Sequence, residues 1–460
     1  MRKLQRIWLK WLIFVLFGYF LLGKGFAYLF LGEILLASGI LIFLLSRRIM
    51  LIVSDPLLLL WFAFAFWGFC RTVPYVGQFR FDAIRDDVIW GYGIAALLVA
   101  AFVNHSSQIS GALNTYRKFL RWYLPIIPIL LILSIALSSR LPKIPWSNGV
   151  SIIHLKAGDV GVNIAVAGVF LLFFTDKRNS FALARSGVSL YGAAAIAGWW
   201  VTVLFILAAN RAGTLAIVGA LLLVLIMRAH ESAEKILIIG FVGALITGST
   251  FLAFPPSLTL AGRTFNSEVL VKTLGSMVGG SGEGTGHETT AQWRLKWWSN
   301  IANETFYGPY FWTGRGFGQN LAIVNGPYGA AASREEVTLR SPHSGTMTVL
   351  ARMGVPGLLL WASINILFAV RMVRAQRLAV KRGSLFWGRL TLWILASWLA
   401  TLIDLSFDVY LEGPQGGIWF WTIIGFGIAA MRIQKHELKG PQNSLQHPSE
   451  QIDAALLARS

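Results

Sequence analysis

The sequence is dominated by apolar runs that are long enough to cross a lipid bilayer. A membrane-spanning α-helix needs about 17–25 mainly apolar residues. Candidate runs lie near residues 8–22, 28–46, 51–70, 89–104, 122–139, 158–175, 188–209, 212–228, 236–254, 343–370, 385–405 and 416–431. Because only helices and closed barrels satisfy their backbone groups in lipid, this pattern predicts an all-α polytopic integral membrane protein with about twelve transmembrane helices.

The distribution of charge predicts the orientation of the chain. The net charge of +19 has two interpretations, which are binding to a nucleic acid and anchoring of cytoplasmic loops. Membrane proteins accumulate Lys and Arg in their cytoplasmic loops. If the N-terminus lies inside, the inner segments hold most of these cations and the short outer loops hold few. This asymmetry excludes a nucleic acid as a partner and favours membrane lipids as the partners of these cations. It also predicts that both termini lie in the cytoplasm.

The spacing of the apolar runs divides the chain into four parts. Residues 1–254 form an N-terminal transmembrane region of about nine helices, and residues 343–438 form a C-terminal one of about three. Between them, residues 255–342 form a large outer loop, and loops of this length are usually functional or disordered. An amphipathic helix is expected around Gln292–Trp298 within this loop. The polar residues 439–460 are expected to be a disordered cytoplasmic tail.

Two arginines on the outer side are candidate ligands for a phosphate group. Arg211 lies in a very short outer loop, and Arg294 lies four residues before Trp298 on one face of the amphipathic helix. In one interpretation Arg211 is a helix-end side chain that reaches the membrane surface, and Arg294 faces lipid headgroups. In the other, the two guanidinium groups hold a diphosphate, for which the planar fork of arginine is suited.

His343 differs in its position from the other histidines of the chain. It follows a proline and opens the apolar run that ends near residue 370, so it lies at the boundary between the outer loop and the membrane. The other histidines lie in loops or in the tail. A neutral imidazole can accept a proton near pH 7, so His343 is the candidate general base, with a structural role as the alternative.

Further charged residues surround these candidates in the sequence. Arg352 lies inside an apolar run, which marks a functional site by default. Asp404 and Asp408 follow at the outer end of a later run, where they can pair with Arg352 or orient His343. Arg315 lies in the outer loop, within a Gly-Arg-Gly-Phe-Gly run that begins at Gly314.

Metal-binding patterns are absent from the sequence. It contains no His-Glu-x-x-His and no Asp-x-Asp. The acidic residues Asp82, Asp86 and Asp87 have Arg80 and Arg85 beside them, which favours an ion-pair network over a metal site. We therefore expect no metal and no cofactor.

In this combination the chain resembles the O-antigen ligase and polymerase superfamily of bacterial envelope glycosyltransferases. The resemblance rests on about twelve helices with one long outer loop before a late helix, on Arg211-Ala-Gly, and on the spacing from Arg294 to Trp298. It also rests on Gly-Arg-Gly-Phe-Gly, on Pro-His343-Ser, and on the later Gly-Val-Pro-Gly-Leu-Leu at Gly354. The sequence departs from the family where it has Ser344, because asparagine is frequent there.

The resemblance implies a GT-C-like fold in the bacterial inner membrane, with the large loop and the active site in the periplasm. It implies a metal-independent, inverting glycosyltransferase that moves a glycan from undecaprenyl diphosphate to an acceptor hydroxyl. Arg211 and Arg294 match the two periplasmic arginines of the family, and His343 matches its loop-end histidine. The aromatic residues of the loop would offer faces on which sugar rings stack.

The acceptor distinguishes two activities within this superfamily. A ligase uses lipid A core in lipopolysaccharide assembly and is the first expectation. A polymerase of O-antigen or exopolysaccharide uses a second lipid-linked repeat unit. A lipid-linked glycan transporter is the alternative from another class, but transporters place their charges along a central cavity between pseudo-symmetric halves. Here the unusual residues gather around one loop, and the two halves share no visible repeat.

The predicted topology can be tested with a reporter fused near Gly282. An alkaline phosphatase fused there should be active, because this enzyme folds only in an oxidising compartment, while the same fusion at the C-terminus should be inactive. A reporter near Gly282 that behaves as cytoplasmic would contradict the whole scheme, since it would place the arginines on the side away from the lipid-linked donor.

Overall fold

The computed structural model of the chain describes residues 1–46, 50–147, 149–174, 190–227, 258–260, 263–265, 286–326 and 340–438. These residues are mostly helical, with one antiparallel pair of short strands, β1 (Leu258–Leu260) and β2 (Arg263–Phe265). The helices are α1 (Arg2–Leu22), α2 (Lys24–Ala27), α3 (Leu31–Leu45), α4 (Met50–Ser54), α5 (Pro56–Phe79), α6 (Phe81–Asp86), α7 (Val88–Gly91), α8 (Ile94–Phe102), α9 (Ser106–Ala136), α10 (Ala157–Phe174), α11 (Leu190–Ala209), α12 (Arg211–Met227), α15 (Gly286–Ala302), η1 (Asn303–Tyr307), α16 (Leu321–Val324), α17 (Gly345–Lys381), α18 (Leu385–Leu405), η4 (Tyr410–Glu412) and α19 (Pro414–Glu437).

The helices follow the apolar runs of the sequence. Each predicted span within the described residues falls largely on a helix, and the run near 236–254 lies outside the described residues. By length and composition, eight helices can cross a membrane, namely α1, α5, α9, α10, α11, α17, α18 and α19. The helices α3 and α12 and the stretch Val88–Phe102 are apolar but shorter. The chain is therefore a helical membrane protein, while the number of its spans stays a prediction.

Several helices are longer than their apolar runs predict, and the added length is greatest in α5, α9 and α17. Helix α9 begins at Ser106, so Arg117, Lys118 and Arg121 lie on this helix. The prediction of a connecting segment between the runs 89–104 and 122–139 is therefore wrong for these residues. Helices α5 and α17 likewise continue past the ends expected near residues 70 and 370. Lys and Arg have high helix propensity and recur in the added parts of α9 and α17, whereas the added part of α5 holds one arginine, Arg71. Hydropathy marks only the part of a helix that is suited to lipid.

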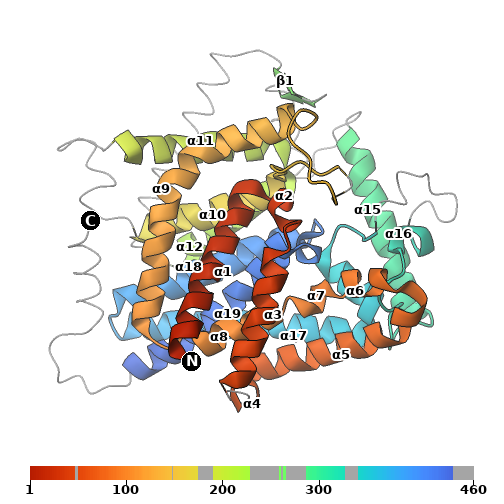
Figure 1. Cartoon of the computed structure of the whole chain (residues 1–460), viewed down its shortest axis with the longest axis horizontal. Coiled ribbons are helices and arrows are strands. Elements are labelled where there is room, and N and C mark those ends of the chain that lie inside the picture. Colours follow the sequence, from red (N-terminus) through yellow and green to blue (C-terminus); the bar gives the residue numbers. More distant parts are fainter. Residues whose placement is uncertain are drawn as a thin grey trace.

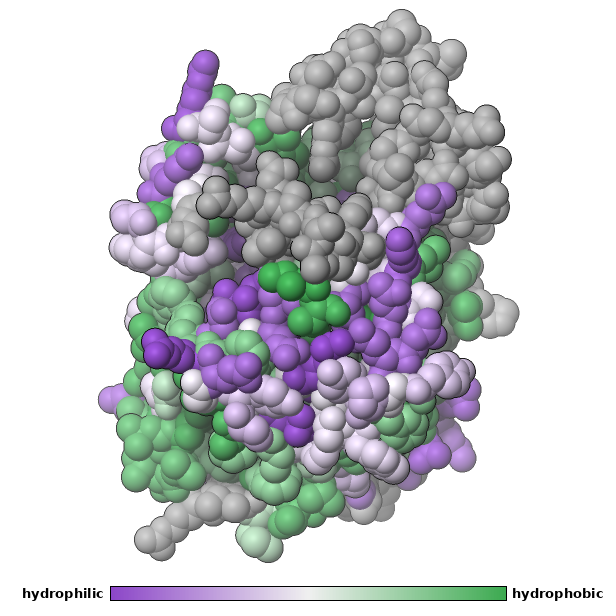
Figure 2. Space-filling model, turned by 90° about the vertical axis from the view of Figure 1, so that its right-hand side faces the viewer, coloured by the Kyte–Doolittle hydropathy of each residue, from purple (hydrophilic) through white to green (hydrophobic). Residues whose placement is uncertain are grey.

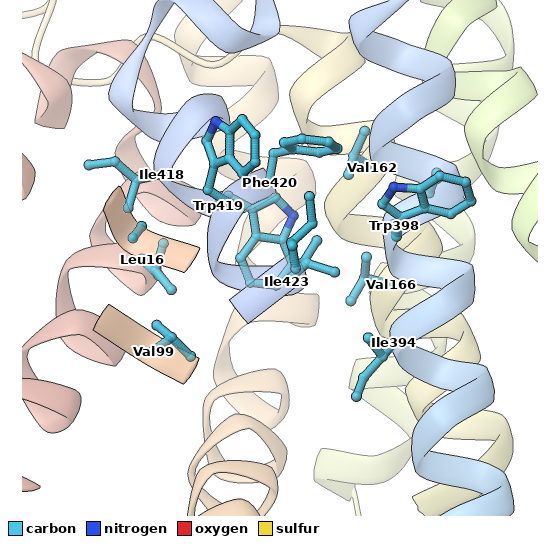
Figure 3. Close-up of a cluster of buried hydrophobic side chains, with 14 of the residues drawn as sticks. Leu16, Val99, Val162, Val166, Ile394, Trp398, Ile418, Trp419, Phe420 and Ile423 are labelled. Carbon is cyan, nitrogen blue, oxygen red and sulfur yellow. The ribbon is translucent and has the colours of Figure 1, made fainter. Parts of the chain in front are cut away.

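Helices α10, α18 and α19 form the centre of the bundle. Within their most apolar windows, 89%, 78% and 83% of the residues are buried, compared with 28% in α11. Figure 3 shows Val162 and Val166 of α10, Ile394 of α18 and Phe420 of α19 in one cluster. Peripheral helices expose apolar side chains that suit contact with lipid. The central helices instead provide the rigid frame on which the ends of α10, α12 and α18 are placed.

Helices α15 and α16 of the segment before α17 lie at one end of the molecule. Helices α15 and α16 lie together with α6 at the right of Figure 1, away from the N-terminus. A small second core joins them to the bundle, in which Trp297, Ile301 and Leu321 pack with Leu350 and Ala351 of α17. The predicted amphipathic helix is thus found as α15. It is fixed to the membrane helix that His343 precedes.

Helix α17 is broken at Gly354, and the Gly-Arg-Gly-Phe-Gly run fills the break. Gly354 has φ 66° and ψ −167°, and Pro356 has no N–H to donate to the preceding turn. The N–H groups of Arg315 and Gly316 donate to the carbonyls of Ala351 (2.7 Å) and Arg352 (3.0 Å), and the Val355 N–H donates to the Phe311 carbonyl (2.8 Å). The glycine run therefore satisfies backbone groups that the broken helix leaves free.

The docking of this run predicts that Gly354→Ala destabilises the protein strongly. Its backbone lies in a region that only glycine adopts readily, at a cost of about 1–3 kcal/mol to other residues. In addition, a Cβ at Gly354 would come 2.6 Å from the Phe311 carbonyl oxygen. The matched control is Gly383→Ala, which also has a positive φ but has no atom within 4 Å of the added Cβ.

The measurement is the thermal midpoint of the detergent-purified variants, followed by tryptophan fluorescence. Gly383→Ala should lower the midpoint only slightly, and Gly354→Ala should lower it by several degrees more. Equal midpoints for the two variants would show that the contact between the run and α17 contributes little to stability.

Candidate functional site

His343 is held in an unusual backbone conformation at the start of α17. Its φ is 50°, in the left-handed region that few residues other than glycine adopt, although histidine is enriched among them. Ser344 caps the helix, since its side chain accepts a hydrogen bond from the Met347 N–H. The Trp298 indole N–H donates to the Pro342 carbonyl at 2.8 Å. Strained residues of this kind concentrate at functional sites.

The imidazole of His343 faces a carboxylate. Its Nδ1 lies 3.6 Å from Oδ1 of Asp408, which follows α18, and its ring meets the Trp293 ring edge to face at 6.0 Å. The side chains of His343 and Asp408 keep 24% and 18% of their surface exposed. A carboxylate at Nδ1 favours the tautomer whose Nε2 is free to accept a proton. Catalytic contacts of this kind are often somewhat long in proteins without substrate.

Asp408 collects donors from three parts of the chain on the same oxygen. The Val409 N–H donates to Oδ1 at 2.7 Å, and the Lys156 ammonium lies at 3.4 Å from it. Burial by itself would raise the pKa of the Asp408 carboxyl, but His343, Lys156 and the Val409 N–H together hold this pKa well below its usual range. These contacts favour the charged form of Asp408.

Arg294 of α15 lies close to this carboxylate and to Arg211. Burial lowers the pKa of the Arg294 guanidinium, the charge of Asp408 opposes this, and the charge of Arg211 lowers it further. The Arg294 Nε is buried and has no hydrogen-bond partner within the described residues. Two cations close enough to repel each other are stabilised when an anion lies between them.

Arg211 is placed by the tight contact of α12 with α10. The Asn210 side chain accepts from the Gly213 N–H at 2.7 Å and so caps α12, which begins at Arg211. A Cβ at Gly161 of α10 would lie 2.6 Å from the Gly213 Cα, so the two backbones touch where both residues lack a side chain. The Arg211 Nε is also buried without a hydrogen-bond partner in the part of the chain that the structure describes.

These contacts bring the three principal sequence candidates into one region. Asp408 contacts His343 and interacts electrostatically with Arg294. Arg294 also interacts electrostatically with Arg211. Figure 2 views the end of the molecule that carries α15 and α16, and hydrophilic residues gather across the middle of this face, with hydrophobic residues along its lower part. The arrangement offers a proton acceptor beside two cationic groups.

Arg352 lies outside this group and has a different partner. It is 1% exposed, and its guanidinium lies 2.9 Å from Oδ2 of Asp86. It also donates to the carbonyls of Gly316 and Gln319, both at 3.3 Å. The pairing of Arg352 with Asp404 or Asp408, which the sequence left open, is therefore not found. Arg352 joins α17 to α6 and to the glycine run.

The predicted ion-pair network of the outer acidic cluster is confirmed for Asp82, Asp86 and Arg85, whereas Asp87 and Arg80 have no ion pair within the described residues. Arg85 lies 3.3 Å from both Asp82 and Asp86, and Arg340 lies 3.2 Å from Asp82 and 3.0 Å from Asp86. Because Arg340 comes shortly before His343, this network fixes the end of the outer segment to α6.

Arg315 and Asp404 have supporting positions. Arg315 lies 2.9 Å from Glu304 and stacks at 4.4 Å on the Tyr310 ring, so it orders its own segment. Asp404 is completely buried in α18, and neither of its carboxylate oxygens has a hydrogen-bond partner among the described residues. A Cβ at Gly158 would come within 2.7 Å of Asp404, which places this carboxyl against the start of α10.

The aromatic residues of the outer segment do not all suit sugar stacking. Trp297 is completely buried, and its indole N–H donates to Asn325 at 2.8 Å. Its expected role as a stacking face is therefore wrong. Tyr307 and Trp312 are 89% and 70% exposed and remain suitable for stacking.

Lys156 is a member of the site that the sequence did not single out. One signal pointed to it, because it is a cation in a short outer loop, as Arg211 is, and such cations oppose the usual distribution of charge. Among the described residues no three His, Cys, Asp or Glu side chains are placed to share a metal ion. The absence of a metal from the reaction stays a prediction.

One comparison with known proteins identifies a family. Residues 193–362 match the family described as O-antigen ligase, and this range contains Arg211, Arg294, Arg315, His343 and Arg352. The resemblance inferred from the sequence motifs is thus confirmed. No curated protein matches the chain.

Proposed function

Since this chain carries the domain of the O-antigen ligase family, we propose that it is a glycosyltransferase that moves a glycan from undecaprenyl diphosphate to an acceptor hydroxyl. The observation that supports this most directly is the contact of His343 with Asp408 beside Arg294 and Arg211. A base and two cations are what the transfer of a sugar from a diphosphate requires.

In the proposed reaction the two arginines bind the diphosphate of the donor. The bond between the anomeric carbon and the diphosphate oxygen breaks, and the negative charge that develops on the leaving group is stabilised by the guanidinium groups. Both Nε groups lack a partner within the described residues, so they are available to a ligand. Arginine presents two parallel donors to a pair of phosphate oxygens, which adds orientation to charge.

His343 then serves as the general base for the acceptor. Its Nε2 takes the proton of the acceptor hydroxyl while the oxygen attacks the anomeric carbon from the side opposite the diphosphate, so the configuration inverts. Asp408 orients the ring and keeps the proton of the neutral imidazole on Nδ1, so that Nε2 is free to accept a proton. A positioned base of this kind contributes about 10²–10⁴-fold to the rate.

The proposal includes the location of the site. We place it on the periplasmic side of the bacterial inner membrane, with both termini in the cytoplasm, in a GT-C-like arrangement of about twelve helices. Residues 255–342 form the periplasmic segment between the transmembrane regions 1–254 and 343–438. The position of α15 and α16 at the end of the molecule away from the N-terminus supports this arrangement.

The first acceptor to test is lipid A core, which defines a ligase in lipopolysaccharide assembly. A second lipid-linked repeat unit would define a polymerase. Purified protein is incubated with a glycan on undecaprenyl diphosphate and with each acceptor separately, and products are separated by gel electrophoresis. Transfer to neither acceptor by folded protein would contradict the proposed function.

Arg211→Lys and Arg294→Lys should each lower transfer by about 10²-fold although they keep the charge, since lysine cannot form the two-point contact with a phosphate. The matched control is Arg140→Lys, at an exposed position in another connecting segment. The measurement is kcat/KM for the donor. Activity of either variant equal to that of the control would return that arginine to a structural role at the membrane surface.

His343→Ala should lower transfer by about 10²–10⁴-fold while donor binding persists. The side chain is partly exposed at the helix start, so its truncation leaves no large internal cavity. Donor binding is measured by the shift of the thermal midpoint with added lipid diphosphate. A variant that turns over normally, or that no longer binds donor, would exclude the role of general base.

A further inference from the structure

We propose that Lys156 is a positioning residue that holds Asp408 against His343 and offsets the effect of the carboxylate's charge on the imidazole. This role rests on the proposed function, in which His343 must be both oriented and unprotonated. It assigns a task to a residue at the start of α10 that belongs to neither the outer segment nor the loop of Asp408.

Lys156 and His343 both contact the same carboxylate oxygen. The Lys156 Nζ and the His343 Nδ1 lie 3.4 Å and 3.6 Å from the same oxygen, Oδ1 of Asp408. The Val409 N–H donates to this oxygen as well, at 2.7 Å. The carboxylate therefore cannot turn away from His343 without also losing its contact with the lysine.

Lys156 is held independently of the elements that carry Asp408 and His343. The His154 N–H donates to the Leu22 carbonyl (3.0 Å), and the Lys24 N–H donates to the His154 carbonyl (2.9 Å). The Leu155 N–H donates to the Ser134 hydroxyl (2.9 Å), and α10 begins at the next residue after Lys156. Lys156 thus joins the frame of α1, α9 and α10 to the loop between α18 and α19.

The charge of Lys156 matters because Asp408 alone would make His343 a poor base. A carboxylate beside an imidazole stabilises the protonated ring, and a protonated ring cannot accept a proton from the acceptor. A cation on the same oxygen opposes this stabilisation while leaving the carboxylate in place to orient the ring. With Lys156 on the same oxygen, Asp408 orients the His343 imidazole without strongly favouring its protonated form.

Other charged groups also act on this pair and must be counted. They are Lys24 beside α1, Asp159 on α10, Arg294 on α15 and Asp404 on α18, each of which interacts with Asp408, together with Arg211, which interacts with Arg294. None of these has an ion pair with Asp408 within the described residues, where Lys156 and His343 are its two partners. Lys156 is thus the cation with direct contact.

The test compares Lys156→Met with Lys156→Arg and with Lys143→Met. The last variant removes the same charge from an exposed site in the preceding segment. In Lys156→Met the acid limb of the profile of kcat against pH should move up by about one pH unit, so kcat at pH values below this limb should fall by up to about tenfold and recover partly at higher pH. Lys156→Arg and Lys143→Met should keep the limb in its place.

A second readout does not depend on transfer. The protonation of His343 is followed by NMR of protein labelled with ¹⁵N in its histidine rings, with His343→Gln used to identify the signal. The titration midpoint of His343 should move upward in Lys156→Met by the same amount. If the chain transfers no glycan, the proposed function fails, but this midpoint still decides the role of Lys156.

Folding is controlled by a milder variant and by a double variant. Lys156→Gln removes the charge but keeps a donor for Asp408, so it serves if Lys156→Met does not fold. In an Asp408→Asn background, Lys156→Met should add little to the loss of transfer, because the lysine acts through the carboxylate. A folded Lys156→Met or Lys156→Gln variant with an unchanged acid limb and an unchanged midpoint would overturn the proposal, as would full additivity with Asp408→Asn.

Discussion

The break in α17 imposes a requirement on the rest of the outer end of the molecule. A helix that is interrupted among apolar helices leaves carbonyls without donors, and unsatisfied backbone groups are costly there. The chain meets this requirement with residues from far away in the sequence, since Arg315 and Gly316 donate to the last turn before Gly354. The Trp67 indole N–H of α5 donates to the Met353 carbonyl at 2.8 Å. The outer segment is thereby joined to α17 through its backbone, and the Arg71 side chain of α5 donates to the Thr313 carbonyl of this segment at 2.7 Å.

This docking determines where the functional side chains lie. With residues 311–316 held at the break, α15 packs on the first turns of α17 through Trp297 and Leu350, and Arg294 on α15 comes close to Asp408. The charges of the region accordingly fall into two groups. Arg352, Arg340 and Arg315 have carboxylate partners and hold the scaffold. Arg211 and Arg294 have none within the described residues.

The sequence predicted the helices and the candidate residues better than it predicted the contacts between them. Apolar runs identified the helices, because contact with lipid selects for apolar residues along the part of a helix that crosses the membrane. Arg211 was identified because an arginine on the outer side opposes the usual distribution of charge. The sequence could not predict that Arg352 pairs with Asp86. These residues are far apart in the chain and meet only when α6 packs against the glycine run. The burial of Trp297 was missed for the same reason. An amphipathic pattern does not tell whether an aromatic residue faces lipid, sugar or another helix.

The separation of the two groups of arginines has a physical consequence for the site. Partly buried cations that repel each other, and whose Nε groups have no acceptor within the described residues, raise the free energy of the site, and the binding of an anion lowers it again. Asp408 cannot fully supply that anion, because Lys156 and His343 already occupy its Oδ1. A ligand with at least two negative oxygens, as in a diphosphate, can supply the negative charge that the two arginines still lack. In the proposed reaction, the lysine that holds Asp408 beside His343 thus leaves the two arginines to the diphosphate.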